Sequence, residues 1–229
     1  MINRNKPGYL ITLEGGEGSG KTLAQQEIIT FLQEHNLPHI ALREPGGTNI
    51  GDQIRVVLDS MDNYMISEEA EVLLFQASRA QLTSEVLLPS LQEGKIVVLD
   101  RFWDSTIAYQ GYGHGIDFNL LKILVNFAAK GLVPDLTILL DVDSRVGLER
   151  KALQNQMTRF EQFYDYEYHS RVNAGYREMA GINIHRRWET VNANLSLEWV
   201  RSDVIHTVEG KLINAGFIES SNYKPERFI

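Results

Sequence analysis

The sequence predicts an α/β fold in which a parallel central sheet of about five strands is flanked by helices. Three short apolar runs indicate strands buried on both faces, because each is almost continuously apolar and is followed by an acidic residue; they are Tyr9–Leu13, Ile96–Leu99 and Leu136–Leu140. Helical patterns lie between these runs. Strands that alternate with helices are joined by crossover connections, which give a parallel sheet.

The first half of the chain alternates strands and helices in order. A helical pattern covers Thr22–Glu34, and a weaker strand candidate, Pro38–Leu42, follows it. A long helix is then predicted from Ser67 to about Leu88. Ser67 and the two glutamates after it resemble a helix cap, and Pro89 is expected to end the helix.

The second half continues the same alternation. Apolar residues at helical spacing predict a helix over residues 120–128, and Trp188–Val191 is the last strand candidate. No repeat, low-complexity tract or Pro/Gly/Ser linker divides the chain, so residues 1–229 are expected to form a single domain. A tail at about 219–229 is expected to be a loose terminus. In such a sheet ligands bind beyond the carboxyl ends of the strands, where the polar and glycine-rich motifs of this chain lie.

The composition excludes several classes of protein. The absence of cysteine excludes disulfides, thiolate metal sites and cysteine nucleophiles. A formal net charge of −8 argues against non-specific binding to nucleic acid. The N-terminal apolar stretch is too short for a signal peptide, and no apolar run approaches the roughly 20 residues of a membrane span. We therefore expect a soluble, cytoplasmic protein without membrane or nucleic-acid partners.

A glycine-rich segment between the first strand and the next helix matches the pattern G-x-x-x-x-G-K-[ST] completely. Glycines let such a loop wrap so that its backbone N–H groups converge on phosphate oxygens. Lys21 is expected to neutralise the β- and γ-phosphates of a nucleoside triphosphate, and the Thr22 hydroxyl is expected to ligate Mg²⁺. The residues expected to bind the nucleoside triphosphate here are Gly15, Gly16, Glu17, Gly18, Ser19, Gly20, Lys21 and Thr22.

The phosphate-loop motif leaves the acceptor open. A switch GTPase would carry the pattern N-K-x-D after a later strand, but the only Asn-Lys pair, Asn5-Lys6, precedes the first strand. A motor ATPase would usually be a longer chain with a second basic finger on a separate module. The size of this chain favours a small nucleotide kinase.

Further basic residues follow the second and third strands. Arg43 begins a segment that continues as Glu-Pro-Gly-Gly-Thr, and a helix that carries Arg55 comes next. Asp100 and Arg101 follow the third predicted strand, Ile96–Leu99, where the carboxylate can hold a metal-bound water and the guanidinium can bind a phosphate. Any one of these arginines could instead form a surface ion pair worth about 0–1 kcal/mol. Because all of them lie just past strand ends, we predict a second phosphate site and phosphoryl transfer between nucleotides.

Five stretches, in this order and spacing, are similar to the motifs of bacterial thymidylate kinases. They are LEGGEGSGKT (13–22), REPGGT (43–48), AEVLLFQASRAQ (70–81), DRFWDSTIAYQGYGHGID (100–117) and PDLTILLDV (134–142). The resemblance covers approximately residues 9–210 and implies a P-loop nucleoside monophosphate kinase-like fold with a short lid. It also implies Mg²⁺-dependent phosphorylation of dTMP to dTDP with ATP, in dTTP biosynthesis, by an enzyme that is commonly a homodimer.

The resemblance assigns roles to the acceptor site. Phe75 and Arg79, four residues apart on one helix, are expected to stack on thymine and to hydrogen-bond its carbonyl edge. Thr106 and Gln110 are expected to read the base, and Tyr109 to favour deoxyribose. The full set expected to bind dTMP is Glu17, Arg43, Glu44, Pro45, Arg55, Phe75, Arg79, Arg101, Ser105, Thr106, Tyr109 and Gln110.

The resemblance also implies which residues act in catalysis and complete the ATP site. The catalytic set comprises two residues of the motifs above and three basic residues of a lid at about 147–161, namely Lys21, Arg101, Arg150, Lys151 and Arg159. Asn192 and Ala193 are expected to surround adenine, and Thr22 and Asp100 to hold the metal. Glu17 matches the acid that contacts the 3′-hydroxyl of the nucleoside monophosphate.

Two alternatives with the same fold stay open. An acceptor without a phosphate, such as a deoxynucleoside, is disfavoured by the arginines that follow the second and third strands. A non-catalytic nucleotide-binding regulator is disfavoured by the intact Lys21, Thr22 and Asp100. His114, which stands where relatives usually carry arginine, is expected to be structural.

Overall fold

The computed structural model describes residues 7–153, 164–182 and 186–219 of the chain. Its centre is a sheet of five parallel strands in the order β2-β3-β1-β4-β5. The strands are β1 (Tyr9–Glu14), β2 (His39–Arg43), β3 (Ile96–Asp100), β4 (Leu136–Asp141) and β5 (Trp188–Asn192). The α/β fold and all five strands predicted from the sequence are therefore confirmed.

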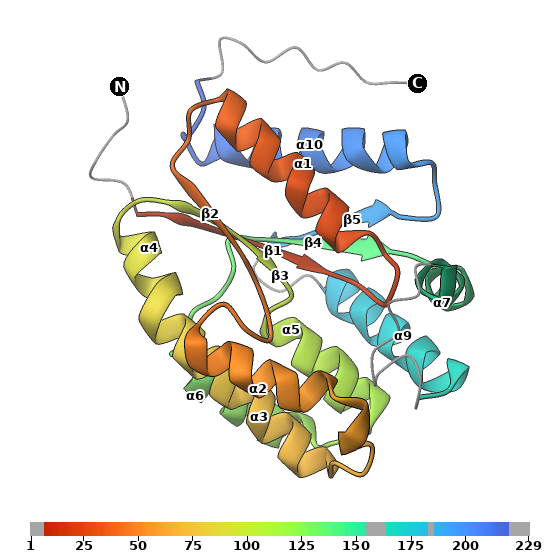
Figure 1. The fold of residues 1–229 in the computed structure, drawn as a ribbon. Coiled ribbons are helices and arrows are strands. Elements are labelled where there is room, and N and C mark those ends of the chain that lie inside the picture. Colours follow the sequence, from red (N-terminus) through yellow and green to blue (C-terminus); the bar gives the residue numbers. More distant parts are fainter. Residues whose placement is uncertain (1–6, 154–163, 183–185, 220–229) are drawn as a thin grey trace.

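Helices cover both faces of the sheet (Figure 1). They are α1 (Lys21–Glu34), α2 (Asn49–Asp59), α3 (Glu68–Leu82), α4 (Leu88–Gln92), α5 (Trp103–Thr106), α6 (Phe118–Ala128), α7 (Ser144–Leu153), α9 (Tyr166–Ile182) and α10 (Leu197–Asn214). α1 and α10 lie on one face, and most of the other helices lie on the opposite face. The apolar runs are continuous because both faces are buried: in β1, Leu10 and Ile11 pack into different core clusters.

The helix that begins after Ser67 continues past Pro89, and the prediction that it ends there is wrong. α3 is followed by a π-helical turn, Thr83–Leu87, and then by α4, whose second residue is Pro89. The turn is closed by a bond from the Leu88 N–H to the Thr83 carbonyl oxygen, five residues back. After this turn α-helical geometry resumes at Leu88, so Pro89 lies in the first turn of α4, where proline is tolerated because its missing N–H is not needed.

The register of the sheet brings the ends of three strands to one level. Arg43 of β2 and Leu13 of β1 both lie beside Asp100 of β3. The loops that follow these strands therefore start from the same edge, where parallel α/β sheets bind ligands. Among the helices that the structure describes, none has the length and apolar character needed to cross a membrane.

Candidate active site

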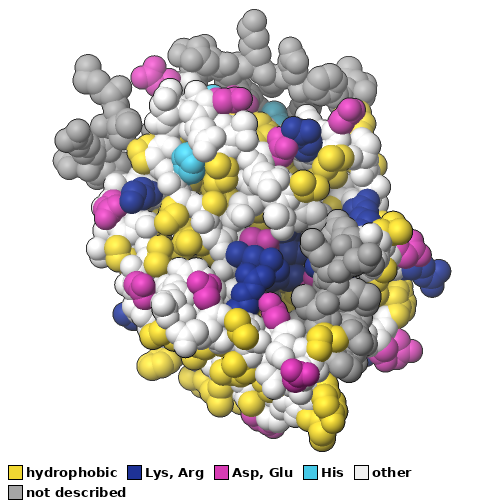
Figure 2. Space-filling model, viewed as in Figure 1, with side chains coloured by type: hydrophobic (Ala, Val, Ile, Leu, Met, Phe, Trp, Pro, Cys, Tyr) yellow, Lys and Arg dark blue, Asp and Glu magenta, His cyan; other side chains and the backbone are white. Residues whose placement is uncertain are grey.

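Two adjoining cavities lie at this edge of the sheet. The phosphate-loop cavity extends from the loop after β1 to α7 and α10, and its walls include Gly18, Ser19, Gly20, Lys21, Thr22, Asp100, Arg150 and Ala193. The α3 cavity lies between β2, α3 and α5, and its walls include Glu44, Pro45, Phe75, Arg79, Ser105, Thr106, Tyr109 and Gln110. Four of the described residues line both cavities: Glu17, Arg43, Arg101 and Lys151. Lys and Arg side chains gather in a hollow at the centre of the face in Figure 2.

The phosphate loop holds Lys21 inside the first cavity. Gly20, at φ +91°, has left-handed backbone that glycine adopts without strain, and α1 begins directly after it. The Lys21 Nζ donates to the carbonyl oxygens of Gly15 and Gly16, at 3.0 and 2.9 Å, and to Ser19 Oγ at 3.1 Å. The buried ammonium group can exchange these acceptors for phosphate oxygens, which a helix N-terminus also attracts.

The affinity for ATP should fall at high pH because of Lys21. Burial, followed by the positive charge of Arg101, lowers the pKa of Lys21 from 10.5 to about 8. Bound phosphates favour the charged amine, so ATP binding should take up a proton and weaken by up to about tenfold per pH unit above about pH 8. Calorimetric titration of ATP between about pH 7 and about pH 9.5, in buffers of different ionisation enthalpy, measures both effects.

Lys21→Arg, whose side chain stays charged throughout, is the control for this titration. Its affinity for ATP should vary less with pH than that of the wild type. A wild-type affinity that stays constant over the whole range would contradict the prediction.

Arg101 and Glu17 form an ion pair where the two cavities meet. Arg101 Nη2 lies 2.8 Å from Glu17 Oε1, and the Tyr109 hydroxyl donates to the same oxygen at 2.6 Å. Burial would raise the pKa of Glu17, but Arg101, Lys21 and this hydroxyl hold the pKa well below its usual range. Arg101 has a left-handed φ of +67°, and such strain in a non-glycine residue is typical of functional sites.

Arg79, on α3, is buried, and each of its three guanidinium nitrogens is paired within the protein. Nε and Nη2 bind the Glu44 carboxylate at 2.8 and 2.7 Å. Nη1 donates to the side chains of Gln76 and Thr106, and Nη2 also donates to the Phe102 carbonyl oxygen. The guanidinium therefore lies in the wall of the α3 cavity, and a base could hydrogen-bond to it only after one of these bonds opens.

Arg79→Ala is expected to lower the free energy of unfolding by about 3–5 kcal/mol, because it leaves the buried Glu44 carboxylate without its partner. Burial already raises the pKa of Glu44 even with the arginine present. Urea unfolding followed by circular dichroism measures the loss. Arg177→Ala, which removes a more exposed ion pair with Asp141, is the control and should cost less than about 1 kcal/mol. Equal losses in the two variants would contradict the prediction.

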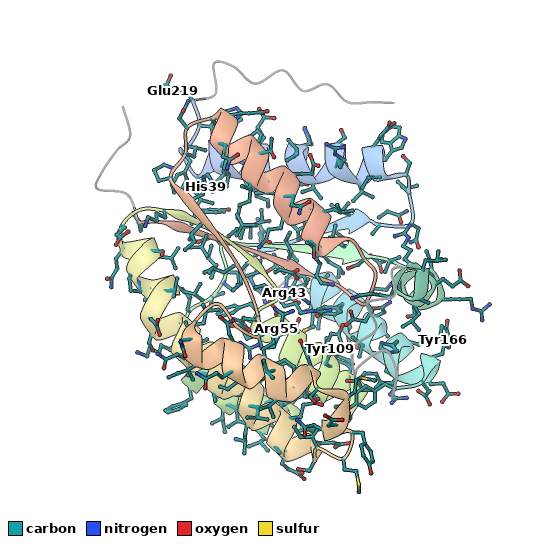
Figure 3. The ribbon with its side chains drawn as sticks, in the orientation of Figure 1. His39, Arg43, Arg55, Tyr109, Tyr166 and Glu219 are labelled. Carbon is teal, nitrogen blue, oxygen red and sulfur yellow. The ribbon has the colours of Figure 1, made fainter. Side chains whose placement is uncertain are left out.

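The remaining residues predicted for dTMP have different surroundings. Arg43, Arg55 and Tyr109 lie between the sheet and the helical layer beneath it (Figure 3). Arg55 Nε lies 3.1 Å from the Asp59 carboxylate on the same helix, and Arg55 lines neither cavity. Gln110 Nε2 donates to the buried Glu71 carboxylate at 3.0 Å.

Only some of the residues predicted for the lid and for adenine binding lie at the phosphate-loop cavity. Arg150 Nη1 donates to the Ala193 carbonyl oxygen at 2.9 Å, and both residues line the phosphate-loop cavity. Lys151 follows on α7, whereas Asn192 lines neither cavity. Arg159 lies outside the described residues.

His114 lies outside both cavities, in a largely buried cluster. Its Nδ1 is 3.2 Å from Glu68, and its Nε2 is 3.4 Å from Glu71. Its ring packs against Tyr164 and Tyr168. These contacts agree with a structural role.

Sequence analysis did not identify two residues that support Arg101. Glu14, the last residue of β1, is buried, and Tyr176, on α9, donates to its Oε2 at 2.9 Å. Like Asp100, Glu14 is an acidic residue at the end of a buried apolar strand. The same sequence pattern could therefore have identified it as a candidate site residue. Tyr176 lies in a helix without a motif, and only the packing of α9 beside the site reveals it.

A sequence profile described as thymidylate kinase matches residues 13–204, a range that holds both cavities. The chain belongs to the thymidylate kinase family. It is 48% identical over 173 residues to the thymidylate kinase of Carboxydothermus hydrogenoformans, an alignment that covers 76% of this chain and 84% of the relative. It is 40% identical over 222 residues to the thymidylate kinase of a Roseiflexus species, with 92% and 97% covered. For the thymidylate kinase of Halothermothrix orenii the identity is 42% over 209 residues, with 90% and 99% covered.

The family resemblance inferred from the motifs is thus confirmed, together with the P-loop nucleoside monophosphate kinase-like fold. As a member of this family, the chain is an enzyme that phosphorylates dTMP to dTDP with ATP, a step of dTTP biosynthesis.

Proposed function

We propose that ATP occupies the phosphate-loop cavity, that dTMP occupies the α3 cavity, and that the γ-phosphoryl group passes between them beside Arg101. The observation that carries this assignment is the shared wall, since Arg101 and three other residues line both cavities. A phosphate bound in one cavity then lies close to a phosphate bound in the other. Phosphoryl transfer depends mainly on such positioning and on the neutralisation of charge.

On the donor side, backbone N–H groups of the phosphate loop bind phosphate oxygens, and Lys21 balances their charge. Arg150 and Lys151 begin the proposed lid at about 147–161 and, with Arg159, supply positive charge to the transferring group. The turn at Asn192 and Ala193 surrounds adenine. Closure of such a lid excludes water and so prevents hydrolysis of ATP. We propose that the lid and the rest of the chain form one domain.

On the acceptor side, Arg43 and Arg101 hold the phosphate of dTMP, and Arg55 joins them after its pair with Asp59 opens. This phosphate is already an anion near neutral pH, so the reaction needs no general base. Glu17 accepts a hydrogen bond from the 3′-hydroxyl of the sugar. Tyr109, which donates to Glu17, occupies the space that a 2′-hydroxyl would need and so favours deoxyribose.

Thymine lies against α3 and α5. Phe75 supplies a stacking surface, and Thr106 and Gln110 present polar groups to the base edge. Arg79 donates to a thymine carbonyl after its bond to Thr106 opens. Glu44, Pro45 and Ser105 complete the wall of the cavity.

We propose Mg²⁺ as the divalent ion that accompanies ATP. Asp100 Oδ1 is buried and has no hydrogen-bond partner among the described residues, and Thr22 lines the same cavity. Mg²⁺ prefers oxygen ligands and keeps several waters, so a hydroxyl and a carboxylate that acts through water fit it. When bound, the ion supplies positive charge to the β- and γ-phosphate oxygens.

A coupled assay of ADP release tests this assignment across nucleoside monophosphates, with Phe75→Ala as the variant. Turnover should be confined to dTMP and, more weakly, dUMP. Because stacking is worth about 1–3 kcal/mol and is nearly indifferent to the base, Phe75→Ala should weaken dTMP by about 5–150-fold and change the preference over dCMP little. Glu69→Ala, at an exposed position of the same helix that lines neither cavity, is the control. Turnover of deoxynucleosides, or no turnover at all, would contradict the assignment.

We also propose that the chain forms a homodimer through α2, α3 and α6. Large apolar side chains are exposed on these neighbouring helices: Val56, Leu73, Leu120, Ile123 and Phe127. Hydrophobic side chains also gather over the lower part of the face in Figure 2. Such a patch is typical of a protein interface. Phe127→Asp should yield a monomer in sedimentation velocity, whereas Leu153→Asp, at an exposed position of α7, should not; a monomeric wild type contradicts the proposal.

The cytoplasmic location stays a prediction.

A further inference from the structure

Glu14 receives hydrogen bonds from two segments that surround Arg101. The Phe102 N–H donates to Oε1 at 2.8 Å, which fixes the backbone directly after the left-handed Arg101. The hydroxyl of Ser105 lies 2.6 Å from Oε2, and that of Tyr176 lies 2.9 Å from it. The buried carboxylate thus joins the end of β1 to α5 and α9.

The same two hydroxyl groups also contact the Arg101 side chain. Arg101 Nη1 lies 3.4 Å from both Ser105 Oγ and Tyr176 Oη, and it donates to the Gly15 carbonyl oxygen at 3.2 Å. Arginine only donates, so each hydroxyl must turn a lone pair toward it. The hydroxyl protons must therefore point elsewhere.

Glu14 determines where those protons point. Ser105 Oγ and Tyr176 Oη lie 2.8 Å apart, so either both hydroxyls donate to Glu14, or one of them donates to the other, which then donates to Glu14. An ionised carboxylate accepts and does not donate. In every arrangement both protons lie within the triangle formed by the Glu14 carboxylate and the two hydroxyl oxygens, so each hydroxyl keeps a lone pair for Arg101.

We propose that Glu14 is a positioning residue for the acceptor phosphate, because its carboxylate fixes the backbone after Arg101 and makes Ser105 and Tyr176 acceptors for the Arg101 guanidinium. The inference rests on the proposed role of Arg101 in binding dTMP. Glu14 does not touch the substrate and acts only through Arg101. A glutamine of the same size cannot replace it, because one side of an amide donates: it faces either the Phe102 N–H or the two hydroxyl oxygens.

The surroundings of Glu14 also raise its pKa, so the pH dependence of dTMP affinity supplies a second test. Burial, followed by repulsion from Asp104, raises the pKa of Glu14 to about 7, whereas Ser105, Arg101 and the Phe102 N–H oppose the rise. Burial also raises the pKa of Tyr176 well above its usual value, so this phenol stays protonated. Asp104 is paired with Arg187 at 2.7 Å on the other side of α5. Acidification below about pH 7 should thus give wild-type Glu14 the neutral character of glutamine.

A double-mutant cycle separates positioning from support of the fold. The affinity for dTMP is measured by calorimetry at about pH 8 in the wild type, Glu14→Gln, Arg101→Ala and the double variant. In the wild-type background, Glu14→Gln should weaken dTMP binding by about tenfold, a change within the range of interaction energies measured between neighbouring residues. ATP affinity should change by less than about twofold. In the Arg101→Ala background the same change should have an effect of less than about twofold. An equal loss in both backgrounds would overturn the proposal.

Three further measurements keep the result interpretable. Asp135→Asn removes a carboxylate that accepts the Leu10 N–H, near the other end of β1, and should leave dTMP affinity unchanged. Between about pH 8 and about pH 5.5, the ratio of wild-type to Glu14→Gln affinity should fall toward one, and a constant ratio overturns the proposal. If Glu14→Gln does not fold, Tyr176→Phe replaces it in the cycle and should weaken dTMP about threefold, only when Arg101 is present.

Turnover of dTMP by the wild type is measured in the same series. Its absence would refute the proposed function. Normal turnover together with an additive cycle would refute only the role of Glu14.

Discussion

Lys21→Ala is expected to reduce kcat by about 10²–10³-fold, because the chain loses a preorganised cation aimed at the phosphates of ATP. The fold should be retained, since the Lys21 ammonium donates, among the residues that the structure describes, only to the phosphate loop, where its acceptors are Gly15, Gly16 and Ser19. Steady-state kinetics with dTMP and saturating ATP measure the loss, and circular dichroism checks the fold.

Two variants make the Lys21 experiment specific. Lys21→Met keeps much of the side-chain length without the charge and should be about as inactive as Lys21→Ala. Lys95→Ala removes a surface lysine that pairs with Glu93 and should keep full activity. Near-normal turnover of Lys21→Ala would exclude the proposed role, and so would a loss of activity explained by unfolding.

Arg101→Ala is expected to weaken dTMP binding and slow transfer together. Loss of a charged hydrogen-bonding contact costs about 1.5–3 kcal/mol, which corresponds to about 10–150-fold in kcat/KM. The variant also leaves Glu17 without its arginine at 2.8 Å, so the pKa of Glu17 should rise from its lowered value. The measurement is kcat/KM for dTMP, with direct titration of both nucleotides.

Arg177→Ala, on the surface of α9, is the control for Arg101→Ala and should leave kcat/KM unchanged. The two titrations decide the side on which Arg101 acts. If ATP affinity collapsed while dTMP affinity stayed normal, Arg101 would belong to the donor site.

The sheet could be predicted from the sequence because burial on both faces requires nearly continuous apolar runs. β3 shows this most clearly, since all of its residues are buried. The phosphate loop could be predicted because its glycines and Lys21 are close in sequence. The end of the long helix could not be predicted, because the π-helical turn before Pro89 interrupts the 3.6-residue period without changing the residue types.

The candidate site was harder to predict where it depends on distant partners. The spacing of Phe75 and Arg79 indicated a shared face, and both line one cavity. The burial of Arg79 could not be predicted, because Glu44, its partner, is 35 residues away. Tyr109 and Gln110 lie in a second π-helical segment, Ile107–Gly113, so a 3.6-residue wheel does not describe the directions of their side chains.

The shared wall of the two cavities has a thermodynamic consequence. With ATP and dTMP bound as proposed, occupancy of one cavity should change the charge and position of groups that the other ligand meets, so we expect the two substrates to be energetically linked. Such linkage is reciprocal: whatever factor ATP imposes on dTMP affinity, dTMP imposes on ATP affinity. Substitutions at the four shared positions should therefore alter the coupling free energy in a ternary complex as well as each affinity measured alone; these positions are Glu17, Arg43, Arg101 and Lys151.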